Sequence, residues 1–279
     1  MLRIRGDRLR IGTGGIPLST PNPTILSGIK RIRELGLDAM ELEFVRSVNL
    51  SKENAKIAKR IAEENDVVLT AHAPYYINLN AVEKEKIDAS IKRILLTAER
   101  TWEAGGYSIV FHAAYYLKSA KSDTYKKVKR AVEFIVKNLQ DRGIEIWIRP
   151  ETTGKPTQFG DLDELIKLSQ EVEMVLPCVD FAHLHARSNG KFNTYEEFSE
   201  VLSKIEEGLG RDALDNMHIH FSGIEYGEKG EKNHLTLKES DLNYEDMVRA
   251  WKDFKIKGVA ISESPNLEGD ALLIKNLLY

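Results

Sequence analysis

The chain has 279 residues, of which 42% are hydrophobic and 30% charged, with a formal net charge of −3. Its length is close to the roughly 250 residues of one (β/α)₈ barrel, and its net charge argues against binding nucleic acid through an overall positive surface. The single cysteine, Cys178, excludes an intrachain disulfide. The N-terminus lacks the apolar run of a signal peptide, and no stretch reaches the roughly 18 apolar residues of a membrane span. We therefore expect a soluble, cytoplasmic protein without a membrane partner.

Short apolar runs alternate with longer amphipathic segments along the first half of the chain. Apolar residues recur at helical spacing in 25–35, Ser51 is a suitable N-cap, and Gly105 can end the third helix. The pattern predicts strands at 8–12, 39–44, 67–71 and 108–111, and helices at 25–35, 51–65, in a region ending near 104, and at 124–139.

The second half repeats this alternation. We predict strands at 144–148, 174–181, 217–221 and 258–261. We predict helices at 162–171, 244–254 and 271–278, and a further helix that begins at the capping box of residues 194–197. Eight strand–helix units predict an α/β protein with one (β/α)₈ TIM-barrel domain over residues 1–279; the alternative is an open doubly wound sheet. No G-x-G-x-x-G motif follows the first strand, so we expect no nucleotide cofactor.

Histidines gather near predicted strand ends. Six of the seven lie at or within a few residues of a strand's C-terminal end, and the seventh lies in the loop after strand seven. In a barrel these ends converge on one mouth, where active sites lie. The seven are His72, His112, His183, His185, His218, His220 and His234.

Three carboxylates, Glu151, Asp180 and Glu263, occupy equivalent strand-end positions. A lone strand-end histidine or glutamate usually has a structural role, but the joint pattern indicates a metal site, because carboxylates and imidazoles together suit Zn²⁺, Mn²⁺ or Fe²⁺. His218 and His220 are two residues apart and point to the same side of their strand, so spacing does not decide which one binds. His183 and His185 leave the same choice open.

Four tyrosines follow the first two strand-end histidines: Tyr75, Tyr76, Tyr115 and Tyr116. They either pack over the barrel mouth or stack against bases or a sugar.

The strand-end blocks resemble those of the endonuclease IV family, the zinc-dependent apurinic/apyrimidinic endonucleases of the xylose isomerase-like barrel superfamily. The likeness extends along most of the chain but depends on short motifs. These are residues 72–79 (HAPYYINL), 111–112 (FH), 151–154 (ETTG), Asp180-x-x-His183, Met217-His218, the loop residue His234 and Glu263.

The resemblance implies hydrolysis of the phosphodiester bond 5′ to an abasic site in double-stranded DNA, as in base excision repair, by a monomer that uses Zn²⁺ or alternatively Mn²⁺. It makes Glu151 a catalytic carboxylate that bridges two metals, and it assigns Tyr75 and Tyr76 to DNA binding. It implies metal ligation by His72 and His112, by Asp180, His218 and Glu263, and, at a third metal, by His183 and His234.

Two departures from the family pattern stand out. The family has an aspartate two residues before the loop histidine, where this chain has Lys232, an ammonium that offers no lone pair. Two zinc ions are therefore expected to bind tightly, and a third only if Glu228 or Glu231 takes that place. Residues 12–19 (GTGGIPLS) also replace the family's Gly-x-His-x-Ser opening.

The main alternative is a sugar isomerase or epimerase on the same barrel, which would hold one metal with Glu151, Asp180, His218 and Glu263. That quartet does not discriminate between the two enzymes. The ligands that only the endonuclease interpretation requires are His72, His112, His183 and His234. A third hypothesis is a non-catalytic nucleic-acid-binding or zinc-binding module.

Overall fold

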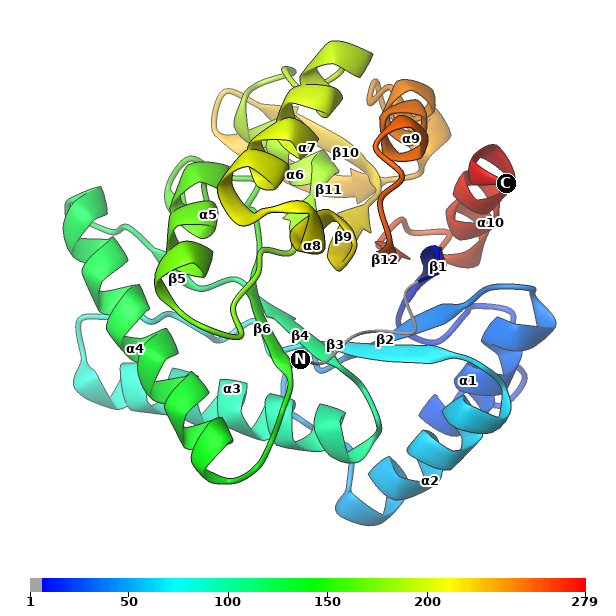
Figure 1. Cartoon of the computed structure of the whole chain (residues 1–279), viewed down its shortest axis with the longest axis horizontal. Helices are drawn as coiled ribbons and strands as arrows, with labels where there is room; N and C mark the ends of the chain where they lie inside the picture. Colours follow the sequence, from blue (N-terminus) through cyan, green and yellow to red (C-terminus); the bar gives the residue numbers. More distant parts are fainter. Residues whose placement is uncertain (1–6) are drawn as a thin grey trace.

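The computed structural model describes residues 7–279 and contains an eight-stranded sheet of parallel strands (Figure 1). The neighbours in this sheet run in the order β6-β4-β3-β2-β1-β12-β9-β8. Their bounds are β1 Leu9–Gly14, β2 Ala39–Glu43, β3 Val68–His72, β4 Ser108–Phe111, β6 Trp147–Pro150, β8 Val179–Asp180, β9 Met217–Phe221 and β12 Gly258–Ser262.

The two outer strands of that order meet and close the barrel. Residues just before β8 form parallel bridges to β6 and the residue after it, Ile148 with Val175 and Glu151 with Cys178. The Cys178 amide donates to the Pro150 carbonyl, and the Thr152 amide donates to the Cys178 carbonyl, each at 3.0 Å. The predicted (β/α)₈ barrel is confirmed, and the open doubly wound alternative is wrong.

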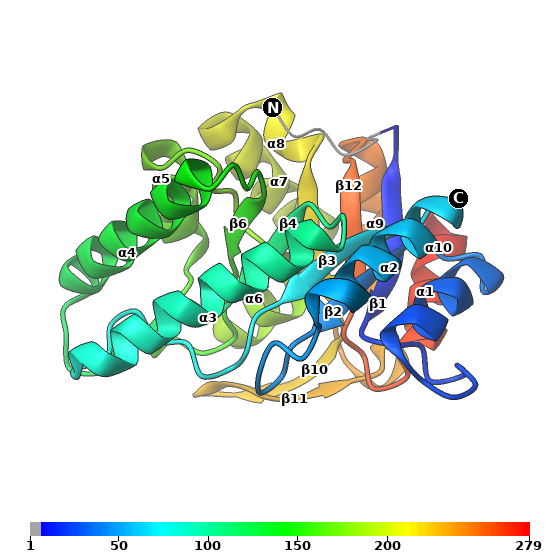
Figure 2. The ribbon, with the colours of Figure 1, turned by 90° about the horizontal axis from the view of Figure 1, so that it is seen from below.

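Amphipathic helices surround the strands (Figure 2). Ser51 caps α2 by accepting from the Asn54 amide, and Thr194 and Glu197 form the predicted capping box of α7. The helices are α1 Ile25–Glu34, α2 Lys52–Glu64, α3 Lys84–Glu103, α4 Lys121–Asp141, α5 Leu162–Glu171, α7 Tyr195–Leu209, α9 Tyr244–Asp253 and α10 Glu268–Leu278. No helix in residues 7–279 combines the length and apolarity that crossing a membrane requires.

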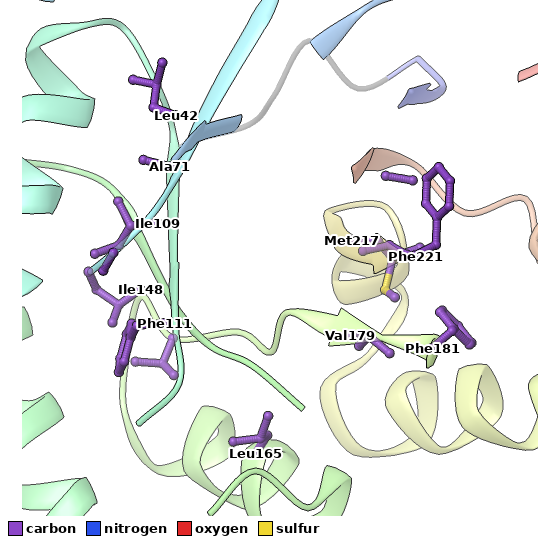
Figure 3. Packing of buried hydrophobic residues seen from close by; sticks show 14 of the residues in the cluster. Leu42, Ala71, Ile109, Phe111, Ile148, Leu165, Val179, Phe181, Met217 and Phe221 are labelled. Carbon is purple, nitrogen blue, oxygen red and sulfur yellow. The ribbon is translucent and has the colours of Figure 1, made fainter. Parts of the chain in front are cut away.

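The main apolar core lies between strands and helices. Side chains from neighbouring strands pack there with Leu165 of α5 (Figure 3). Strand residues of the opposite parity face the barrel interior, and many of these are polar, including Glu41, Thr70 and His218. The strand residues that face the helices include Leu42, Ala71, Ile109 and Ile148, which are labelled in Figure 3.

The loops after the strands contain further elements that the periodicity did not predict. The largest is the antiparallel hairpin of β10 (Gly223–Gly227) and β11 (Gly230–Leu235), which lies across one end of the barrel (Figure 2). The others are β5 Ala114–Tyr115, β7 Gln158–Phe159, α6 Phe181–Arg187 and the 3₁₀ turn Leu237–Glu239. The short helix α8 Arg211–Leu214 lies between α7 and β9.

Candidate metal centre

The C-terminal ends of the strands surround a cavity of about 420 Å³. His72 ends β3, while Glu263 directly follows β12. Segments far apart in the sequence therefore contribute to one wall, as expected at the mouth of a barrel. The cavity is lined by residues that include His72, His112, His183, Glu231, His234 and Glu263.

The first ligand group consists of His72, His112 and Glu151. Nε2 of His72 lies 3.3 Å from Oε2 of Glu151, and Nε2 of His112 lies 3.0 Å from the same oxygen. Each of the three residues offers a ligand atom within 4.8 Å of the others. The two histidines thus converge on one carboxylate oxygen.

The second group uses the other oxygen of Glu151. Nδ1 of His220 lies 3.2 Å from Oε1 of Glu151 and 3.4 Å from Oε1 of Glu263. With Asp180, these residues offer four ligand atoms that all lie within 4.8 Å of one another. Glu151 therefore belongs to both groups and presents one oxygen to each, which is the arrangement a bridging carboxylate requires.

The third group consists of His183, Glu231 and His234. Nε2 of His183 lies 3.7 Å from Oε2 of Glu231. Nδ1 of the same ring contacts the Thr152 carbonyl at 3.0 Å, which orients the imidazole. This group therefore offers three candidate ligands, the number usual for a catalytic zinc ion.

His218 is absent from the second group, where the Met217-His218 motif predicts it, and lies instead in a buried cluster with Cys178 and His220. His220 takes that place in the second group. Two residues span about 7 Å along a strand, so His218 lies one layer deeper in the barrel. There its Nδ1 contacts Oγ of Ser108 at 3.0 Å and its Nε2 lies 2.9 Å from Oε2 of Glu41.

Of His183 and His185, the structure directs only His183 to the cavity. Both lie on α6, which begins directly after Asp180, and the Asp180 carboxylate accepts from the His183 amide at 2.7 Å. Residues two apart on a helix point to different sides. His185 instead contacts the Lys191 carbonyl and Asp241.

Lys232 points away from the third group, whereas Glu231 lies in it. A β-bulge shifts the hairpin register so that Tyr226 pairs with Glu231 while Ile224 pairs with His234. The extra residue reverses the alternation, so Glu231 and His234 share a face although they are three residues apart. The ammonium of Lys232 lies 3.2 Å from Glu225 on the exposed side.

Backbone docking fixes the position of Glu231. Its amide donates to the Gly154 carbonyl at 3.0 Å. At Gly230, whose φ is +89°, a Cβ atom would lie 2.2 Å from that same oxygen, so only glycine permits this approach. The hairpin is therefore held against the loop that follows Glu151.

The tyrosines at the mouth differ in exposure. Tyr75 and Tyr76 are 59% and 62% exposed, and Tyr75 lines the cavity. Tyr115 is also exposed and lines the cavity. Tyr116 is buried and its hydroxyl donates to Glu164 at 2.6 Å, so of the four tyrosines this one packs in the fold.

Burial and neighbouring charges shift the pKa values around the cavity. Burial raises the pKa of the Glu151 carboxyl, but attraction by His112 and His220 outweighs it and holds that pKa well below its usual range. Burial disfavours the charged ring of His72, yet Glu151 and Glu43 raise its pKa to about 10. Burial raises the pKa of Glu43 to about 8. A divalent cation bound here would compete with protons on the histidines.

The donor set fits divalent metal ions. Oδ2 of Asp180 and Nε2 of His183 are buried without a hydrogen-bond partner among the described residues. The cavity wall itself carries three carboxylates and four imidazoles, which offer oxygen and nitrogen ligands of the kind that zinc and manganese accept.

Sequence reasoning missed two residues of β2. Glu43 lines the cavity, and Glu41 lies fully buried beneath it. Two carboxylates alternating within the apolar run 39–44 were the available signal, because a charged group in a strand core is stable only when it is paired.

Residues 29–277 match the family model described as the xylose isomerase-like TIM barrel. An uncharacterized protein of Methanocaldococcus jannaschii is 47% identical over 266 residues, which cover 95% of each chain. A probable endonuclease 4 of Mycoplasma pneumoniae is 25% identical over 198 residues, covering 69% of this chain and 66% of that protein.

Solved structures share the fold. A D-tagatose 3-epimerase-like protein superposes with a TM-score of 0.72 at 22% identity, covering 95% of both chains. Endonuclease IV from Thermus thermophilus has the same TM-score at 18% identity, covering 95% of this chain and 97% of that one. At these identities the likeness concerns the fold, and the two neighbours do not separate endonuclease from epimerase.

Proposed function

The chain belongs to the xylose isomerase-like TIM barrel family, and we propose that within it the protein is a zinc-dependent endonuclease that cleaves double-stranded DNA 5′ to abasic sites. The observation that carries this proposal is the presence of ligand groups beyond the quartet of Glu151, Asp180, His220 and Glu263. The additional groups that line the cavity are His72 with His112, and His183 with Glu231 and His234. Two further clusters lie within ligand distance, Cys178 with His218 and His220, and Glu41 with Glu43 and Glu263.

The additional ligands suit phosphodiester hydrolysis better than isomerisation. A single-metal isomerase needs only the quartet, and a second and third group would be unused there. Bound divalent metals would polarise the phosphate, provide hydroxide near neutral pH and stabilise the leaving oxygen. Zinc suits the nitrogen-rich first and third groups, and Mn²⁺ is the alternative metal.

The protein's own groups have separate tasks in this proposal. Glu151 would contribute to holding a metal in each of the first two groups, because one of its oxygens faces His112 and the other faces His220. Tyr75 and Tyr76 present exposed rings at the mouth, where they can stack in the gap left by a missing base. Lys155 lines the cavity and can pair with a phosphate.

A sugar epimerase is the second candidate, and the position of Glu43 favours it. This carboxyl lines the cavity, and its Oε1 is buried without a hydrogen-bond partner among the described residues. With its pKa raised to about 8, this carboxyl is mostly protonated at neutral pH, so it can both donate a hydrogen bond to a sugar hydroxyl and accept one from it.

Elemental analysis together with a nicking assay tests the proposal. We expect the purified protein to contain zinc and to nick a duplex that carries one abasic site, with activity lost to a strong chelator and restored by divalent metal. Metal-replete protein that leaves the duplex intact but interconverts a ketose and its epimer would establish the epimerase instead. Metal-bound protein that does neither would support the non-catalytic module.

A further inference from the structure

A polar column continues below the metal centre into the barrel. Glu41 of β2 is fully buried, and its two oxygens face different histidines of β9. Oε1 lies 2.7 Å from Nε2 of His220, and Oε2 lies 2.9 Å from Nε2 of His218. This carboxylate therefore sits directly behind the ring whose other nitrogen faces the second ligand group.

These short distances are the closest polar contacts of three buried atoms. Oε1 of Glu41, Nε2 of His220 and Nε2 of His218 have no hydrogen bond of regular geometry among the described residues. Two lone pairs facing each other at 2.7 Å repel strongly, so a proton on Nε2 of His220 suits its contact with Oε1 of Glu41.

The opposite edge of the His220 ring faces the ligands. Its Nδ1 lies 3.2 Å from Glu151 and 3.4 Å from Glu263. A histidine that binds metal through Nδ1 must carry its proton on Nε2. Partners behind the ring commonly select the tautomer of a metal-binding histidine.

We infer that Glu41 is a positioning residue that keeps the proton of His220 on Nε2 and so presents Nδ1 to the second metal group. This inference rests on the proposed function, because it requires that the centre binds metal. It also gives the two histidines of the sequence His218-Ile219-His220 different tasks. His220 is a ligand, and His218 supports the carboxylate that orients it.

Neighbouring groups hold Glu41 in this position. Oγ1 of Thr70 donates to Oε2 of Glu41 at 2.7 Å. His218 contacts the same oxygen, and its Nδ1 is occupied by Ser108. The carboxylate is thus fixed from the adjacent strand β3 and from β9, with its free edge directed at His220.

The test compares zinc binding of the wild type with that of Glu41→Met, Glu41→Gln and Thr70→Val. Methionine removes the acceptor with little change in length, glutamine retains one oxygen acceptor, and valine at Thr70 removes a different donor to the same buried carboxylate. Chelator competition measures the affinities for zinc. Two-dimensional ¹H–¹⁵N spectra of the zinc-loaded proteins identify the protonated ring nitrogens, which is tractable with seven histidines.

We expect Glu41→Met to weaken the binding of one zinc ion by about 10- to 100-fold and Glu41→Gln to recover part of that loss. Thr70→Val keeps the carboxylate and removes only one of its supports, so it should lose less zinc affinity than Glu41→Met. The wild-type spectrum should show His220 protonated at Nε2, and this measurement needs no variant to fold. Protonation at Nδ1, unchanged affinity in Glu41→Met, or an equal loss in Thr70→Val would overturn the inference while leaving abasic-site nicking intact. A wild type that binds no zinc would refute the proposed function, and the inference with it.

Discussion

The second and third ligand groups are built in different ways. The second group takes Glu151, Asp180, His220 and Glu263 from the ends of barrel strands, where the first three are at most 1% exposed. The third group takes Glu231 and His234 from a hairpin that only partly covers them. The barrel strands therefore position the residues of the second group, whereas the hairpin positions Glu231 and His234 of the third group.

This difference predicts unequal rigidity. Parallel pairing fixes His220 opposite Ile261 on β12, and a parallel bridge joins Glu151 to Cys178. The hairpin that carries Glu231 is attached through the contact with Gly154 and through packing on α6. Elements with fewer buried contacts open at lower free energy, so the third metal should leave first on mild chelation.

The largest effect is expected where the first two groups meet. Glu151→Gln replaces the charge between two cations by a neutral amide, so both metal content and nicking rate should fall, the rate by more than about 100-fold, above the usual range for losing an outer-shell partner. Elemental analysis and single-turnover nicking measure this. Glu145→Gln, an exposed change just before β6, is the matched control. Normal metal content with near-normal rate in Glu151→Gln would exclude the bridging role.

The next effect separates the two histidines of β9. His220→Ala should lose one metal and reduce nicking by about 100-fold. His218→Ala should retain its metals with a smaller loss of affinity and lower the melting temperature, because buried His218 contacts Glu41 and Ser108 rather than the second ligand group. Parallel metal counts and thermal melts of the two variants check this. If His218→Ala lost a metal and His220→Ala did not, the motif-based choice of His218 would be restored.

A third prediction concerns the hairpin group alone. Glu231→Ala should weaken the most labile metal by at least about tenfold and leave the other two in place. Lys232→Asp is the control, since the side chain at this position faces Glu225 rather than the ligands. Stepwise removal by a weak chelator gives the order of loss. A labile metal that responds to Lys232→Asp and ignores Glu231→Ala would mean that the bulge does not persist in solution.

The smallest effect is expected at the mouth, outside both groups. Replacing Tyr75 and Tyr76 together by Ala should weaken binding to abasic duplex by about tenfold, from the loss of about 1–3 kcal/mol of stacking. Thermal stability should change little, because both rings are more than half exposed. Fluorescence anisotropy and a thermal melt provide the two readouts. A large loss of stability with unchanged affinity would show that the rings serve packing.

The barrel was predictable because eight apolar runs alternate with helical periodicity, and the errors fall where that pattern fails. The apolar residues at 144–148 placed the fifth strand early, whereas β6 covers Trp147–Pro150. The hairpin was missed because exposed polar side chains, among them Glu225 and Asn233, remove the apolar alternation that marks a half-buried strand.

The positions of the candidate ligands were predictable to within one layer of the barrel. Strand-end position identified Glu151, Asp180 and Glu263, because parallel strands converge at one mouth. Residues two apart in a strand point to the same side, so the sequence placed His218 and His220 on one side of β9. Which of the two lies level with the other candidate ligands depends on how β9 pairs with its neighbours, and the sequence does not show that register. Glu231 depended on a bulge, a tertiary feature without a local signature here.

The bulge at Lys232 also affects how ligands are traced between relatives. Deleting Lys232 would leave a regular strand in which the glutamate stands two residues before the histidine, again on the same face. Gaining or losing one codon in this hairpin therefore keeps the carboxylate and the imidazole on one face while moving the carboxylate to another alignment column. A search that scores each column separately would report the ligand as lost, although the folded chain still places a carboxylate beside His234.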